Sequence, residues 1–328
     1  MDKRYKKLIE VLGENKVQLN EPLDKYSSFH IGGPADIFYR AKTCSDLIKA
    51  FTNAKRFKIP VIVISGGTNL LISDNGYRGL LIKNETNNIK LAGFIGGKKE
   101  KTTEIHTVLL EVESGVSINR LVRFTLDQGL AGLEAFLGQP GSVGGAVWNN
   151  AHNMKMGKFF GDKITSAKIL QPSGKVVEVT KNYFKFGYDQ SIIQKTGDIV
   201  LTVRIKLNTG KKDILWKKAQ EAFEYRQKTQ PTGVFSSGCI FKNIKKSTAV
   251  RLATPNYTCS AGFLLDRAGL KGFQIGNAYF SKNHANFIIN NGKAKAQDVF
   301  NLIKLAKKRI KKDYQVDLEE EIVFIGEF

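Results

Sequence analysis

Apolar residues recur at helical spacing, three and four positions apart, in several stretches of the chain. Ile118, Leu121, Val122 and Leu126 fall on one helical face, and Ser117 just before them is a suitable N-cap. Further helices are predicted on the same grounds over residues 3–12, 45–55, 211–228 and 261–268 and from residue 296 onward. The stretch 211–228 is the most highly charged of these, and a domain boundary is expected near its start.

Short apolar or alternating runs lie between these stretches and predict strands. They cover residues 35–41, 61–65, 105–113, 164–170, 175–180, 198–207, 285–289 and 322–325. Residues 84–103 are rich in glycine and lysine, so a surface excursion between two strands is expected there. Strands and helices therefore both contribute to the fold, and no internal repeat is apparent.

Glycines are concentrated in two places. Residues 137–151 contain Gly138, Gly141, Gly144 and Gly145, and residues 65–69 read SGGTN directly after a predicted strand. Glycine at this density is typical of a tight turn, or of backbone that presses against a flat or anionic ligand. Glycine density alone leaves both interpretations open. Free N–H groups at the carboxyl end of a strand, as in the SGGTN stretch, suit a pyrophosphate.

The composition is that of a globular protein large enough for two domains: 328 residues, 42% hydrophobic and 25% charged. The N-terminal stretch is charged, and no apolar run is long enough to span a bilayer, so we expect a cytoplasmic protein without membrane insertion. The net charge of +21 could indicate nucleic-acid binding or a basic surface that attracts small anionic substrates. Because the lysines are scattered and not interleaved with aromatic residues, a nucleic-acid partner is not expected.

Several kinds of site are not supported by the sequence. The three cysteines, Cys44, Cys239 and Cys259, lie far apart, so neither a disulfide framework nor a zinc site is expected. The four histidines have no HxxxH or HExxH spacing, and no metal site is predicted. The dinucleotide, P-loop and serine-hydrolase motifs are also missing. A cysteine with a function would act as a single thiol.

Eight motifs follow one another over nearly the whole chain. They are SSFHIGGPAD (27–36), SGGTNLLISDNGYRGLLI (65–82), GLEAFLGQPGSVGGAVWNNA (132–151), FGYDQS (186–191), SSGCIFKN (236–243), AGFLLDRAGLKG (261–272), SKNHANFIIN (281–290) and VDLEEEIVFIGEF (316–328). In this order they resemble the UDP-N-acetylenolpyruvoylglucosamine reductase (MurB) family. The short spacing from FGYDQS to Gln230 is similar to the family's shorter type, which lacks an inserted substrate loop.

The resemblance implies an α+β fold with an FAD-binding domain of the vanillyl-alcohol-oxidase (PCMH) type. This domain would comprise two subdomains over residues 26–210, preceded by a helix and connection over 1–25 and followed by a smaller α+β substrate-binding domain over 211–328. FAD would be the cofactor and NADPH the reductant of a cytoplasmic, monomeric enzyme of peptidoglycan synthesis. The residues expected to contact FAD are Ser65, Gly66, Gly67, Thr68, Asn69, Leu70, Gly138, Gly141, Ser142, Gly144, Gly145, Ala146 and Asn150.

The resemblance also implies a reaction: reduced FAD delivers a hydride from N5 to the enolpyruvyl group, and an acid protonates the adjacent carbon. In the family a serine supplies this proton, and Cys239 stands at the matching position. The reference pKa of a thiol is about 8.5, so a neutral thiol can donate a proton readily. Glu321 occupies the family's acidic position, where it would polarise the substrate carboxylate or the enol intermediate, and Tyr188 would hydrogen-bond the substrate.

Two further positions depart from the family pattern. Asp189 stands where the family usually has an arginine that holds the substrate carboxylate, and an aspartate would repel that group. Either another cation takes over, with Arg226, Lys228 and Lys242 as candidates, or the local alignment is displaced, or the activity is altered. His152 stands where a glycine is usual, so a different loop path is expected there.

Asn243 and Lys242 complete the expected site. Asn243 would reach the UDP part of the substrate, and Lys242 is a candidate for its phosphate. The motif that contains His284 and Asn286 is expected to be mainly structural.

Two other classes of function remain open. One is a different FAD-dependent oxidoreductase of the same fold, against which the SSGCIFKN and LEEEIVFIG motifs speak. The other is a basic, non-enzymatic protein that binds nucleic acid. A purified protein that is colourless and takes up no FAD would exclude both flavin interpretations.

Overall fold

The computed structural model describes residues 2–99 and 102–328, and the chain divides into two compact units. The first unit comprises Met1–Leu19, Ile37–Gly66 and Gly79–Arg226, and the second comprises Asn20–Asp36, Gly67–Arg78 and Gln227–Phe328. These units do not divide at residue 211, where we expected a domain boundary. Helix α6 (Lys212–Thr229) begins near there, but its buried Leu215 and Ala219 belong to the core of the first unit.

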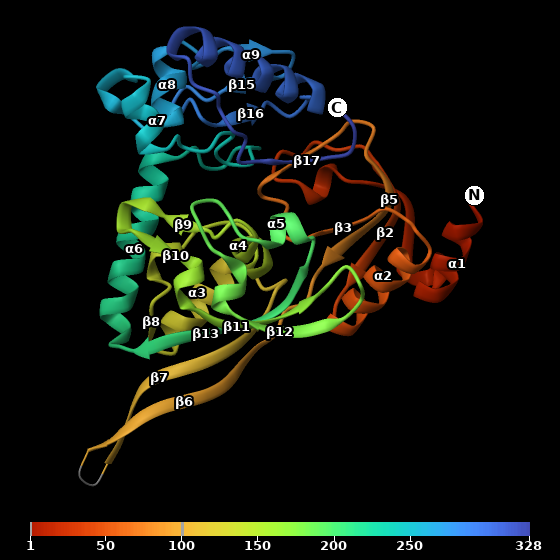
Figure 1. Ribbon diagram of the computed structural model, residues 1–328, viewed down its shortest axis with the longest axis vertical. Coiled ribbons are helices and arrows are strands. Elements are labelled where there is room, and N and C mark those ends of the chain that lie inside the picture. Colours follow the sequence, from red (N-terminus) through yellow and green to blue (C-terminus); the bar gives the residue numbers. More distant parts are fainter. Residues whose placement is uncertain (1, 100–101) are drawn as a thin grey trace. The chain divides into compact units, whose positions relative to one another are not determined.

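A six-stranded sheet dominates the first unit. Its strand order is β12-β11-β13-β7-β6, with β8 also paired to β13, and neighbouring strands are antiparallel. In Figure 1, β6 and β7 extend from this sheet as a long hairpin. The strands are β6 (Ile89–Lys99), β7 (Thr102–Glu113), β8 (Leu130–Ala131), β11 (Ile164–Leu170), β12 (Val176–Thr180) and β13 (Ile199–Thr209).

Much of the segment 84–103, where a surface excursion between two strands was expected, is itself strand. The segment contains the whole of β6, which pairs with β7 along its length, for example Leu91 with Leu110. Strand β6 lies at the edge of the sheet and is held by backbone pairing. Its sequence therefore shows little of the apolar alternation that would predict a strand. Residues 100 and 101 of the segment lie outside the described residues.

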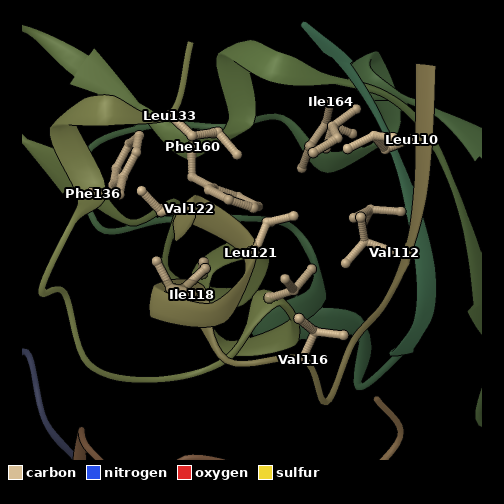
Figure 2. Close-up of a cluster of buried hydrophobic side chains, with 14 of the residues drawn as sticks. Leu110, Val112, Val116, Ile118, Leu121, Val122, Leu133, Phe136, Phe160 and Ile164 are labelled. Atoms are coloured by element: carbon tan, nitrogen blue, oxygen red, sulfur yellow. The ribbon is translucent and has the colours of Figure 1, made fainter. Parts of the chain in front are cut away.

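Two helices pack against the large sheet. Helix α3 (Ile118–Asp127) begins at Ser117, whose side chain accepts a hydrogen bond from the Arg120 N–H, as the N-cap prediction required. Helix α4 (Val143–Trp148) follows the glycine-rich stretch. The apolar faces of both helices and the facing strand residues form one buried cluster, part of which Figure 2 shows around Leu121, Val122 and Phe160.

A smaller sheet of order β1-β2-β5-β3 also has its core in the first unit. Its last two strands run parallel, with Val61 opposite Leu80. Helices α1 (Lys3–Leu12) and α2 (Cys44–Arg56) bury their apolar faces in the same core, as their spacing predicts. The strands are β1 (Val17–Pro22), β2 (Pro34–Ala41), β3 (Val61–Ile64) and β5 (Tyr77–Asn84), and the unit also contains β9 (His152–Asn153), β10 (Lys158–Phe159) and the short helix α5 (Ile193–Thr196).

The second unit has an antiparallel sheet of order β14-β15-β16 and a parallel pair formed by β4 and β17. Its core collects the apolar faces of α8 and α9 together with Phe29, Leu71 and Phe241. The elements are β4 (Leu70–Ile72), α7 (Lys246–Arg251), α8 (Ala261–Arg267), β14 (Gln274–Ile275), β15 (Ala278–Phe280), β16 (Ile288–Asn290), α9 (Ala296–Tyr314) and β17 (Val323–Ile325). Within the part of the chain that the structure describes, no helix is both long enough and apolar enough to cross a membrane.

Candidate functional site

The two glycine-rich stretches meet inside the first unit. A Cβ atom added at Gly66 would lie 2.8 Å from Gly141 Cα, so these two backbones touch without any side chain between them. Ser65 is fixed from both sides: its hydroxyl donates to Asn84 O at 3.1 Å, and its carbonyl accepts a hydrogen bond from Lys83 Nζ. Burial lowers the pKa of the Lys83 ammonium. Because the atoms that a Cβ at position 66 would meet are backbone atoms of Gly141, packing requires a glycine there.

The stretch after Leu137 is an ordered loop that leads into a helix, which the sequence did not predict. Gly141 has a φ of 105°, a region that favours glycine, and Ser142 then caps α4 by accepting from Gly145 N at 3.2 Å. Gly144 N donates to Ser114 O at 2.7 Å. The nearest atom outside the helix backbone that a Cβ at Gly145 would meet is Ser142 Oγ at 3.6 Å, so this face of α4 is open.

Asn150 organises the loop that carries Tyr188. It adopts a left-handed φ of 51°, which asparagine tolerates better than most residues. Its side-chain oxygen accepts from Gly161 N at 3.0 Å, and its Nδ2 donates to Gly187 O at 2.9 Å. These contacts give Asn150, which we expected to lie beside FAD, a structural role in fixing the FGYDQS segment.

Asp189 and His152, the two departures from the family pattern, lie against each other in this loop. Asp189 is 2% exposed, and one of its carboxylate oxygens lies 3.3 Å from His152 Nδ1. The His152 ring packs on Tyr188, with ring centroids 4.8 Å apart. The sequence identified both residues as unusual but gave no sign that they are in contact.

In the second unit, the remainder of the SGGTN stretch joins distant parts of the chain. Asn69 Nδ2 donates to Glu321 O at 3.0 Å, and the Ser237 hydroxyl donates to Leu70 O at 2.9 Å. Gly67 has a φ of 67°, and a Cβ there would overlap Tyr26 O at 1.9 Å, so glycine is required for backbone conformation and for space. Thr68 continues this segment toward β4.

Cys239 and Glu321 belong to one strip of paired backbone in the second unit. Cys239 forms an isolated antiparallel bridge with Phe287, and Glu321 N donates to the carbonyl of the next residue, Ile240, at 2.8 Å. Cys239 is half-buried and is not part of a disulfide. The backbone of Glu321, the predicted acidic residue, is thus hydrogen-bonded both to the Asn69 side chain and to Ile240. Ile240 directly follows Cys239, the predicted proton donor.

Glu320, the neighbour of Glu321, has a structural partner. Its carboxylate forms an ion pair with Lys307 Nζ at 2.8 Å. Glu319 is exposed, and its backbone oxygen accepts from Lys242 N at 2.9 Å. Of the three consecutive glutamates, Glu320 is therefore accounted for by an ion pair and Glu319 by its exposure to solvent.

The motif with His284 and Asn286 supports this strip, in keeping with the structural role expected for it. Asn286 is 3% exposed, accepts from Phe241 N at 2.9 Å and donates to Phe241 O at 2.8 Å. Asn286 N donates to His284 Nδ1 at 3.3 Å, and burial lowers the pKa of His284, so its ring acts as a neutral acceptor. Asn286 therefore clamps the backbone two residues after Cys239.

Three of the expected substrate-binding residues, Lys228, Lys242 and Asn243, are in the second unit. Asn243 is exposed, and its side-chain oxygen accepts from Ala261 N, at the start of α8, at 3.1 Å. Lys242 is half-buried, and Lys228 is exposed on α6. Among the described residues, no group of three or more His, Cys, Asp or Glu side chains could hold a metal ion.

The chain matches known proteins over nearly its whole length. Residues 230–325 match the family model for the C-terminal domain of UDP-N-acetylenolpyruvoylglucosamine reductase, and residues 35–180 match that for an FAD binding domain. The chain is 36% identical over 328 residues to UDP-N-acetylenolpyruvoylglucosamine reductase 1 of Bacillus cereus, which covers 99% of this chain and 100% of that protein. The chain belongs to the UDP-N-acetylenolpyruvoylglucosamine reductase family.

Other members of the reductase family agree with this assignment. The enzyme of Caldanaerobacter subterraneus is 34% identical over 326 residues, or 98% of this chain and 97% of that protein. The crystal structure of the reductase from Thermus caldophilus has 30% identity and a TM-score of 0.71, and the match covers 94% of this chain and 98% of that one. The predicted resemblance is thereby confirmed.

The predicted fold class is confirmed as well. The structure of p-cresol methylhydroxylase is only 10% identical but has a TM-score of 0.50 over 99% of this chain and 90% of that one, which shows a shared fold. Together with the FAD-binding match, this likeness confirms an FAD-dependent flavoprotein of the PCMH type.

Two residues of this reductase family member were overlooked in the sequence. Ser237 belongs to the SSGCIFKN motif, but no role was predicted for it from the sequence. Its hydroxyl donates to Leu70 O and so connects Leu70 to the segment that contains Cys239. Lys83 is a charged residue inside the apolar run of β5, next to Ile82 and Asn84. A lysine in such a run is a signal that could have identified it, because buried lysines need a partner.

Proposed function

We propose that this chain reduces UDP-N-acetylenolpyruvoylglucosamine to UDP-N-acetylmuramate with NADPH, as a cytoplasmic, monomeric enzyme of peptidoglycan synthesis. One observation carries the proposal beyond family membership: the backbone strip of the second unit that joins Asn69, Cys239 and Glu321. Three segments that are far apart in the sequence, one of them glycine-rich, are brought together there.

The glycine-rich stretches fit FAD. Gly66, Gly67 and Gly141 each lie where backbone must pass close to other backbone or adopt positive φ, and Gly145 leaves one face of α4 open. Backbone of this kind can approach a flat ring or a phosphate more closely than backbone with side chains. The residues that would hold the cofactor are Ser65, Gly66, Gly67, Thr68, Asn69, Leu70, Gly138, Gly141, Ser142, Gly144, Gly145, Ala146 and Asn150.

FAD, when bound, supplies the hydride that NADPH provides and that reduces the enolpyruvyl double bond. The protein must then add a proton to the adjacent carbon, so that two electrons and two hydrogens enter the substrate. Cys239 donates this proton from its thiol and is reprotonated from solvent. Glu321, whose N–H is bonded to Ile240 O, would polarise the substrate carboxylate or the enol intermediate by donating a hydrogen bond from its protonated carboxyl group.

Four further residues are expected to contribute to substrate recognition. Tyr188 hydrogen-bonds the substrate, Asn243 and Lys242 reach its UDP part, and Lys228 adds positive charge. The net charge of the whole chain, +21, raises the local concentration of this anionic substrate.

The decisive experiment separates the two halves of the reaction. Cys239→Ala should retain FAD and be bleached by NADPH at the wild-type rate, but should lose turnover of the enolpyruvyl substrate by at least about a hundredfold, the usual contribution of general acid catalysis. Cys259→Ala is the matched control, because Cys259 is also half-buried and also lies in the second unit.

Two results would contradict the proposal. A purified protein that is colourless and retains no FAD after incubation with FAD and removal of the unbound flavin would refute the whole assignment. Unimpaired turnover by Cys239→Ala would refute the role of the thiol alone. Glu321→Gln provides an independent check, since it should lower turnover and leave flavin reduction by NADPH unchanged.

A further inference from the structure

Asp189 is a buried carboxylate with too few partners. Its side chain is 1% exposed, and neither carboxylate oxygen accepts a hydrogen bond from any residue that the structure describes. A buried charge is tolerated only beside a proton donor or an opposite charge. One carboxylate oxygen lies 3.3 Å from His152 Nδ1, a buried nitrogen that also has no hydrogen-bond partner among the described residues, and the two groups form an ion pair when the imidazole is protonated.

The loop around Asp189 is fixed by contacts other than this pair. Gly187 N donates to Gln190 O at 3.0 Å, and the Ser191 hydroxyl donates to Trp148 O, at the end of α4, at 2.6 Å. Gln194 Nε2 donates to Asp189 O at 3.1 Å. The carboxylate is thus held in place by its backbone, with a φ of 49°, and one of its oxygens lies 3.3 Å from His152 Nδ1.

The His152 ring packs against two aromatic neighbours. Its centroid lies 4.8 Å from that of Tyr188 and 5.8 Å from that of Phe159. The ring is 17% exposed at its side chain, so part of it is reachable from outside. An imidazole that has Nδ1 near a carboxylate and its ring against Tyr188 can serve as a donor beside a residue that we propose to bind the substrate.

We propose that His152, oriented by Asp189, contacts the carboxylate of the enolpyruvyl substrate. This proposal rests on the proposed function and deepens it. A protonated imidazole donates from both nitrogens, so His152 can donate through Nδ1 to Asp189 and through Nε2 to the substrate anion. Asp189, which could only repel the anion by itself, acts as a positioning residue. The two departures from the family pattern then form one working pair.

The test is a double-mutant cycle on the complete flavoprotein. His152→Ala and Asp189→Asn should each raise KM for the enolpyruvyl substrate by about 10- to 100-fold, the range for a hydrogen bond to a charged group. The double variant should be no worse than His152→Ala, because Asp189 acts only through the imidazole. Asparagine is chosen because it has the shape of aspartate and tolerates the left-handed backbone.

Controls and cofactor measurements separate this proposal from the proposed function. His106→Ala and Asp213→Asn remove an exposed histidine and an exposed aspartate from the same unit and should leave KM unchanged. FAD content and bleaching by NADPH should match the wild type in all variants. A wild-type protein that lacks these two properties would defeat the proposed function, and the pair would then have no substrate to bind.

A second measurement does not depend on the activity of any variant. In the wild-type holoenzyme, the ¹⁵N spectrum of His152 should show a proton on Nδ1, and Asp189→Asn should shift that signal. Three outcomes would overturn the proposal: a KM for His152→Ala within twofold of the wild type, additive effects in the double variant, or an Nδ1 without a proton in the wild type.

Discussion

Replacing Gly66 by alanine tests the contact between the two glycine-rich stretches. The new Cβ would lie 2.8 Å from Gly141 Cα and 3.2 Å from Gly141 C, whereas ordinary contacts begin at 3.4 Å. Both partners are backbone, so no side chain can rotate away, and the stretches must separate by about half an ångström. Overpacking of this kind costs about 1–3 kcal/mol. For a unit of this size, that corresponds to a fall in Tm of between about 2 and 12 °C.

The assay is thermal unfolding of the protein with and without FAD, together with the amount of FAD retained after gel filtration. Gly66→Ala should lower Tm in both states and retain less FAD. Gly145→Ala is the control: its Cβ has room at 3.6 Å from Ser142 Oγ, and alanine stabilises a helix by about 0.5–1 kcal/mol relative to glycine. Its apo form should be at least as stable as the wild type, while its FAD affinity falls. If Gly66→Ala matched the wild type in both Tm and FAD content, the packing argument would be wrong.

Three further substitutions probe the supports of the site. Asn286→Ala leaves the N–H and C=O of Phe241 buried without their partner, so urea denaturation should show a loss of about 2–4 kcal/mol, and an unchanged midpoint would contradict the clamp. Burial lowers the pKa of His284 below its ordinary value of 6.5, so the unfolded chain binds more protons between the two values and stability falls as the pH drops through that window. In His284→Gln, the urea midpoint should therefore change less between about pH 7 and pH 5.5 than in the wild type; an equal change would assign the effect to other groups. Lys83→Met keeps the apolar stem but removes the hydrogen bond to Ser65 O, so stopped-flow measurement should show faster FAD release. An unaltered release rate would show that Lys83 does not hold the Ser65 segment in place for FAD.

Most of the regular structure could be predicted from local pattern. Helices α1, α2, α3 and α9 carry apolar residues at clear helical spacing, and each begins within one residue of its predicted start. Helix α4 was missed because Gly144 and Gly145 lower helix propensity, and its stability comes from the Ser142 cap and from packing in the core. Strand β6 was missed because its glycines and lysines give little apolar alternation.

The candidate site could be predicted residue by residue but not as an arrangement. The motifs identified Asn69, Cys239 and Glu321 individually, and only the fold joins them, since contacts between residues far apart leave no local signal. His152 and Asp189 are similar: each departure from the family pattern was visible, and their contact was not. The roles of these residues in catalysis remain predictions until the variants are measured.

The parallel pairing of β4 with β17 has a consequence for how the protein is made. Asn69 and Glu321, which the pairing brings together, are 252 residues apart in the chain. At about 5–20 residues per second, translation leaves the Asn69 segment waiting roughly 13 to 50 s for its partner. During that time β4 is an apolar strand with an unpaired edge, exposed to association with other chains. The segment that completes the candidate site thus also needs protection from association with other chains while the protein is being synthesised.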